Sequence, residues 1–107
     1  MKKDKEVTDV IFRKFKDGEI IGLFPYIPEF RYKTCVSYMH VGQHGIAHLE
    51  IIRTTKPASE TEYLDLFSEL ENQIGYKLRI IKRLSWKKYK RTHDLLRLRI
   101  EKHVKKF

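Results

Sequence analysis

Residues 10–21 read Val10-Ile11-Phe12-Arg13-Lys14-Phe15-Lys16-Asp17-Gly18-Glu19-Ile20-Ile21, and this stretch decides the fold class. Apolar and polar residues alternate before Asp17-Gly18, and a second apolar stretch, residues 20–27, follows it. A period of two is that of a half-buried strand, and Asp-Gly suits a type I′ turn because both central positions of that turn need positive φ. The stretch therefore predicts an antiparallel β-hairpin.

A second hairpin is predicted downstream of two prolines. We expect Pro25 and Pro28 to end the preceding strand, because proline donates no hydrogen bond to a sheet, and residues 29–33 to be a connecting loop. Residues 34–41 and 46–55 are the expected paired strands, around the turn Gly42-Gln43-His44-Gly45. Gly22 lies inside a predicted strand, which indicates a bulge or a close backbone approach.

The chain then changes to helical periodicity. Ser59 and Glu62 form a capping box, and Gly75 provides a C-terminal stop. Between them, five apolar residues recur on one stripe that we expect to be buried: Tyr63, Leu66, Phe67, Leu70 and Ile74. Residues 76–84 alternate again and predict a fifth strand, and Ser85 is a suitable cap for a final helix toward Phe107.

These elements together predict an α+β fold. Two antiparallel β-hairpins, a helix, a fifth strand and a basic C-terminal helix follow one another, so one helix should pack on a sheet of about five strands. A chain of 107 residues suits a single core. We expect residues 1–84 to form one α+β domain and residues 85–107 to be a basic helix that is appended to it or packed on it.

Positive charge gathers in the last third of the chain. Residues 1–76 hold 10 Lys and Arg and 12 Asp and Glu, a net charge of −2, whereas residues 77–107 hold 13 and 2, a net charge of +11. Such a segment attracts polyanions, of which nucleic acid is the commonest inside a cell. The predicted nucleic-acid-binding residues are Lys77, Arg79, Arg83, Trp86, Lys87, Lys88, Lys90 and Arg91. Lys77, Arg79 and Arg83 should share one side of the strand, where alternate residues about 6.6 Å apart can track backbone phosphates.

The final helix also allows a different partner. Trp86 and Tyr89 have helical spacing with Leu96 and Ile100, which is typical of core or interface residues, although aromatic rings among cations can also stack on unpaired bases. The second functional hypothesis is therefore a protein-binding module, such as an inhibitor of a host protein or a homodimer. Its apolar face would consist of Trp86, Leu96, Ile100 and Phe107.

Three histidines lie close together in the second hairpin and are the candidates for catalysis: His40, His44 and His48. If Gly42 pairs with Gly45, His40 lies opposite Ala47, whereas a loop one residue longer pairs His40 with His48. Only the second register makes a shared site, with His40 and His48 as candidates for metal binding or acid–base chemistry. The third functional hypothesis is a small histidine-dependent hydrolase.

Other features narrow the class of protein. Cys35 is the single cysteine and can form no internal disulfide, and no apolar run approaches the ~20 residues of a membrane-spanning helix. No apolar segment of the kind found in signal peptides follows Met1-Lys2-Lys3-Asp4, so we expect a cytoplasmic protein without membrane association. P-loop, dinucleotide-binding and HExxH motifs are missing, and we therefore expect no cofactor.

Two segments carry a resemblance. They are residues 10–26, with Leu23-Phe24-Pro25-Tyr26 at their end, and Ser37-Tyr38-Met39-His40-Val41-Gly42-Gln43-His44-Gly45. Together with Thr55-Lys56-Pro57-Ala58, they resemble a group of small proteins encoded by bacteria and their phages or mobile elements, over roughly the first 84 residues. The resemblance implies no activity, but a host-directed inhibitor and a DNA-handling accessory protein are both natural roles in that setting. Our prediction is a non-enzymatic accessory protein that binds DNA or RNA.

Overall fold

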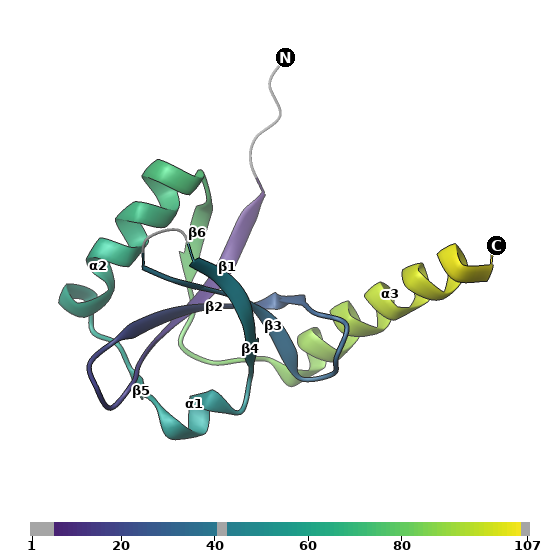
Figure 1. The fold of residues 1–107 in the computed structure, drawn as a ribbon, viewed down its shortest axis with the longest axis horizontal. Helices are drawn as coiled ribbons and strands as arrows, with labels where there is room; N and C mark the ends of the chain where they lie inside the picture. Colours follow the sequence, from purple (N-terminus) through teal and green to yellow (C-terminus); the bar gives the residue numbers. More distant parts are fainter. Residues whose placement is uncertain (1–5, 41–42, 106–107) are drawn as a thin grey trace, which may run out of the picture.

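Six strands form one mixed sheet in the computed structural model, which describes residues 6–40 and 43–105, with side chains up to residue 102 (Figure 1). Four of them make two antiparallel hairpins: β1 (Val7–Lys14), β2 (Ile20–Pro28), β3 (Thr34–Met39) and β4 (Gln43–His48). They lie in the order β4-β3-β2-β1. The predicted α+β class and both hairpins are confirmed.

Two short strands extend the sheet beyond β1. β5 (Lys56–Pro57) pairs antiparallel with the end of β1, and β6 (Lys77–Ile80) pairs parallel with its start. The carbonyls of Phe12 and Val10 accept hydrogen bonds from Ala58 and Ile81. Because residues two apart point to the same edge of a strand, β5 and β6 follow one another along one edge of β1. The sheet thus has one strand more than predicted, and β6 ends at Ile80 instead of Leu84.

The first turn differs from the predicted type I′. Lys14 pairs with Ile20, so five residues connect the strands, and the N–H of Gly18 donates to the carbonyl of Phe15 at 2.9 Å. Gly18 has a φ of 93°, whereas Asp17 is not among the described residues with positive φ. A connection of this length needs one left-handed residue instead of two, and the type I′ prediction is therefore wrong.

Pro25 does not end β2. The partner of Phe24 is Val36 and the partner of Pro28 is Cys35, so the three residues between Phe24 and Pro28 form a bulge. The missing donor of Pro25 is tolerated because the regular ladder is already interrupted there. Gly22 marks a close approach as predicted: a Cβ atom at this position would lie 3.3 Å from a ring carbon of Phe12 on β1.

The strand predicted over residues 46–55 ends early. β4 stops at His48, and Ile51–Thr54 form a single helical turn, α1. Arg13, which is 8% exposed, donates to the hydroxyl and carbonyl of Thr55 and to the carbonyl of Ile52, at 3.0, 2.5 and 2.8 Å. A guanidinium group that binds several oxygens at once holds this segment away from the sheet ladder, and the sequence pattern of residues 46–55 alone does not reveal it.

Helix α2 (Glu60–Glu69) covers one face of the sheet (Figure 1). The predicted capping box is confirmed, since the N–H of Ser59 donates to Glu62 at 2.8 Å. The helix continues as a π-helical turn, η1 (Leu70–Ile74), and ends at Gly75 with a φ of 97°. Leu66 and Leu70 pack against the sheet with Val10, Phe12, Phe24 and Tyr38. Ile74, which was predicted to be buried, is 42% exposed.

Helix α3 (Trp86–Lys105) and α1 lie on the other face. Tyr89 is buried in a second cluster with Ile11, Leu23, Cys35 and Leu49. The cap at Ser85 is confirmed, because its hydroxyl accepts the N–H of Lys88 at 3.2 Å. Helices therefore cover both faces of the sheet, and the start of the C-terminal helix packs on the domain, which is one of the two predicted alternatives. The C-terminal half of α3 projects away from the sheet (Figure 1). None of the described helices is long and apolar enough to span a membrane.

Candidate nucleic-acid interface

The start of α3 is attached to the first residue of β3 and to the loop that precedes it. The hydroxyl of the fully buried Tyr89 donates to the carbonyl of Thr34 at 2.9 Å. One turn later His93, which is 5% exposed, has its Nε2 atom 2.9 Å from the carbonyl oxygen of Phe30. Tyr89 is thus a core residue, as its helical spacing indicated, and its ring is not available to a ligand.

Two of the predicted phosphate-binding residues have an internal partner. Asp9 on β1, 8% exposed, pairs with Arg79 of β6 at 2.6 Å and with Lys88 of α3 at 3.3 Å. The hydrogen bond from Arg79 is the main reason that the pKa of Asp9 lies below its usual value, although burial opposes it. Lys88 also lies 4.4 Å from the ring centroid of Tyr26. Arg79 and Lys88 therefore connect β6 and α3 to Asp9 of β1, and only part of each side chain remains exposed to a ligand.

The other predicted cations face solvent without a carboxylate partner in the part of the chain that the structure describes. They are Lys77, Arg83, Lys87, Lys90 and Arg91, all of them exposed. Arg83 lies beyond the end of β6, so the prediction that it continues the row of Lys77 and Arg79 on one strand is wrong. Lys77 lies at the start of β6, whereas the other four cations form a surface that runs from the turn after β6 along α3.

The loop of residues 29–33 completes this surface, although the sequence alone indicates only a connecting role for it. The Nζ atom of Lys33 lies 5.9 Å from the centroid of the Trp86 ring. The ring of Tyr32 lies 5.7 Å from Tyr89 and 5.2 Å from His93, measured between centroids. The signal that could have revealed the loop is its alternation of aromatic and basic residues, Phe30-Arg31-Tyr32-Lys33. We call these four residues, with Trp86 and Lys90, the aromatic–basic surface.

The three histidines of the second hairpin do not meet. The strands pair Tyr38 with His44 and Thr34 with His48, which is neither of the two predicted registers. His40 lies beyond the end of β3, so it cannot face His48 across the sheet. The expected shared site of His40 and His48 therefore does not form. The second strand begins at Gln43, which is earlier in the chain than either predicted register required.

Each histidine has a different partner. The Nδ1 atom of His40 lies 2.8 Å from Glu69, which also accepts a hydrogen bond from Tyr38. His44 Nε2 lies 3.1 Å from the hydroxyl of Tyr76, and His48 Nδ1 accepts the N–H of Glu50 at 3.2 Å. Glu69 and Tyr76 were not anticipated, since their pairing with the hairpin depends on how α2 and η1 pack against it.

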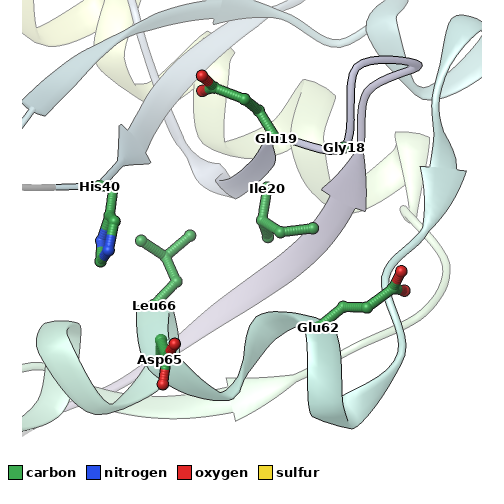
Figure 2. A pocket seen from close by; sticks show the side chains of 7 residues that line it. All are labelled: Gly18, Glu19, Ile20, His40, Glu62, Asp65 and Leu66. Carbon is green, nitrogen blue, oxygen red and sulfur yellow. The ribbon is translucent and has the colours of Figure 1, made fainter.

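A cavity of about 290 Å³ lies beside His40 (Figure 2). It is lined by Gly18, Glu19, Ile20, His40, Glu62, Asp65 and Leu66, and the apolar side chains of Ile20 and Leu66 lie between His40 and Glu62. No hydroxyl or thiol is among these residues, so the lining offers no serine-, threonine- or cysteine-type nucleophile beside the histidine. The thiol of Cys35 is buried elsewhere, and burial raises its pKa to about 12. Within the described residues, no three His, Cys, Asp or Glu side chains are grouped to hold a metal ion.

The basic surface and the histidine cavity lie on different elements, and only the first gathers most of its predicted residues in one place. No family model, curated protein or solved structure matches this chain.

Proposed function

We propose that this protein is a non-enzymatic accessory protein that binds nucleic acid through its basic C-terminal strand and helix. The observation that supports this most is the solvent-facing, unpaired state of Arg83, Lys87, Lys90 and Arg91 among the described residues. Backbone phosphates are the partners that such a row of cations attracts, and they need no sequence-specific contacts.

The fold keeps this charge from being neutralised internally. The acidic helix α2 packs on one face of the sheet, and the start of α3 packs on the other. Among the ion pairs of the described residues, those that involve the basic segment lead to Asp9 and Glu101, and none leads to α2. The sheet therefore separates the acidic helix from the basic one, which leaves a positive potential at one end of the molecule.

Salt dependence tests the proposal. A labelled duplex and a labelled single strand are titrated with the protein by fluorescence anisotropy at about 50 mM and about 200 mM salt. If the four unpaired cations each neutralise one phosphate, the affinity for duplex falls by roughly 150-fold over this range. Absent binding, or equal affinity at the two salt concentrations, contradicts the proposal.

A matched pair of variants locates the site. Replacing Lys87, Lys90 and Arg91 by Gln removes three charges from α3, and we expect the slope of log affinity against log salt to become shallower by about 2.7 for duplex. The control variant replaces Lys16, Arg53 and Lys56 by Gln. These three cations are also exposed, but they lie around the first turn, α1 and β5. Equal losses in the two variants would mean that net charge alone attracts the ligand.

A protein partner is the second candidate function. Leu95 and Leu98, on the solvent side of α3, are 57% and 51% exposed, whereas Leu96 and Ile100 of the predicted apolar face are partly covered and Phe107 lies outside the described residues. Exposed leucines on a projecting helix favour burial against a host protein or a second copy. Light scattering and a nuclease-treated pull-down test this: a monomer that captures no protein, or Leu95→Gln and Leu98→Gln variants that bind equally well, rules it out.

A further inference from the structure

We infer that the aromatic–basic surface takes single-stranded nucleic acid, with Phe30, Tyr32 and Trp86 stacking on unpaired bases. This inference rests on the proposed function and deepens it, because it assigns half of the site to a loop that carries none of the predicted phosphate contacts. Three observations support it: where the exposed aromatic rings lie, how they are held, and which charges surround them.

The exposed aromatic rings of the described chain all occur at this one place. Phe30, Tyr32 and Trp86 are 67%, 45% and 46% exposed, and every other described Phe, Tyr or Trp is more deeply buried. Single exposed apolar residues are ordinary on protein surfaces. Tyr32 and Trp86 come from two distant segments and both contact Tyr89, and Phe30 lies two residues from Tyr32 in the same loop, so they form a patch of the kind that marks binding sites.

Contacts with buried residues hold the rings of Tyr32 and Trp86 in place, and the backbone of Phe30 is held beside them. Trp86 meets Tyr89 edge to face, at 5.8 Å between centroids and 83° between planes. Tyr32 contacts both Tyr89 and His93, and His93 also binds the carbonyl of Phe30. Since Tyr89 and His93 are themselves buried, the rings of Tyr32 and Trp86 sit on a fixed base and lose little conformational freedom when a ligand stacks on them.

Cations accompany the rings in the same two segments. Arg31 and Lys33 alternate with the two loop aromatics, and the ammonium group of Lys33 lies 5.9 Å from the centroid of Trp86. Lys90 follows Trp86 by one helical turn and lies on the same side of α3. A single-stranded nucleic acid whose bases stack on the rings thus has its backbone phosphates near these cations. Single-strand binding proteins combine stacking rings and cations in the same way.

The geometry favours single strands over duplexes. In a duplex both faces of each base are covered by the neighbouring bases, so a protein ring can stack only at the ends. In a single strand, every unpaired base offers a face on which a ring can stack. Loss of one stacking ring lowers the affinity for single strands by about 5- to 150-fold, whatever the sequence. Duplex binding, which uses phosphates alone, is expected to change less than twofold on the same substitution, roughly the scale of surface substitutions.

Trp86 gives a direct readout, because it is the single tryptophan of the chain. Its fluorescence is followed while the full chain is titrated with unlabelled single-stranded DNA, single-stranded RNA, a duplex of the same length and inorganic polyphosphate. Quenching by either single strand, weak quenching by duplex and none by polyphosphate is the expected result, since only a stacked base touches the indole.

Variants separate stacking from structure. Tyr32→Ala and Trp86→Ala should lose affinity for labelled single strands but keep their affinity for duplex, and Tyr32→Phe and Trp86→Phe should retain both. The control is Ile46→Ala, an exposed apolar side chain on β4 that is 66% exposed. A loss that is equal for single strands and duplex, or rescue that fails with Phe, shows that the rings only support the fold and overturns the inference.

Failure of the inference is distinguishable from failure of the proposed function. If duplex and polyphosphate bind as tightly as single strands and no probe quenches Trp86 selectively, the stacking contacts are overturned. The proposed phosphate contacts are still supported by that result. Binding of none of the four probes overturns both.

Discussion

Tyr89 should be the residue on which the attachment of α3 depends, and two substitutions measure this. Tyr89→Phe removes only the hydroxyl that donates to the carbonyl of Thr34. Tyr89→Ala also removes the ring that fills the cluster between α3 and the sheet. The two variants therefore separate the hydrogen bond from the packing.

The expected magnitudes follow from the surroundings. The carbonyl of Thr34 keeps a second donor, the N–H of Glu29 at 3.2 Å, so Tyr89→Phe leaves no orphaned acceptor and should cost about 1 kcal/mol of unfolding free energy. For a domain of this size that lowers Tm by about 4–8 °C. Tyr89→Ala opens a cavity and should cost about 3–5 kcal/mol, a large part of the 5–15 kcal/mol typical of a native domain.

Urea unfolding followed by far-UV circular dichroism and by Trp86 fluorescence provides the assay. Trp86 contacts Tyr89, so its emission reports the start of α3, whereas circular dichroism reports the whole fold. The control is Tyr32→Phe, which alters an exposed ring and should change stability by less than about 0.5 kcal/mol. Equal losses for the Phe and Ala variants, or a loss below about 1 kcal/mol for Tyr89→Ala, would refute the argument.

Three further substitutions test the fold. Asp9→Asn removes the partner of Arg79. Folding lowers the pKa of Asp9. The contribution of its carboxylate to the free energy of unfolding is therefore complete above about pH 3.9 and is lost as the pH falls through the lower pKa of the folded state. The variant should be less stable than the wild type at neutral pH, with urea midpoints that fall less steeply in acid; identical pH profiles contradict this. Gly22→Val should cost about 1–3 kcal/mol by overpacking against β1, whereas Gly45→Val on exposed β4 should stay within about 0.5 kcal/mol, and equal urea midpoints would argue against a close approach. Arg13→Lys should speed hydrogen exchange in α1, because an ammonium group cannot bind all the oxygens that the guanidinium binds; unchanged exchange would remove that role.

Local signals account for most of the elements that could be predicted. Asp17-Gly18, the capping box at Ser59 and the cap at Ser85 each act within a few residues, and all three mark element ends in the structure. Predictions failed where a distant partner decides the outcome. The turn length of the first hairpin, the bulge at Pro25 and the helical turn α1 all depend on how a neighbouring strand or Arg13 contacts the segment.

The candidate site divides in the same way. The basic half, including Lys87, Lys90 and Arg91, was predicted from composition, and the structure leaves those side chains exposed. The loop half was missed, because Lys33 and Trp86 are far apart in the chain and meet only through the packing of Tyr89 and His93. The interaction of Arg79 with Asp9 was missed for the same reason, since it requires β6 to pair with β1.

By itself the amino-acid sequence determined the α+β class, the starts of the two long helices, the stop at Gly75 and the gathering of positive charge in the last third of the chain. These depend on dihedral preference, hydrophobic period and residue count, which are properties of short segments. Only the tertiary structure decided which face of the sheet each helix covers, which cations find a carboxylate, and that an aromatic loop lies beside the start of α3. Those outcomes arise because burial of apolar side chains brings together segments that are distant in the chain, and no local pattern encodes that pairing.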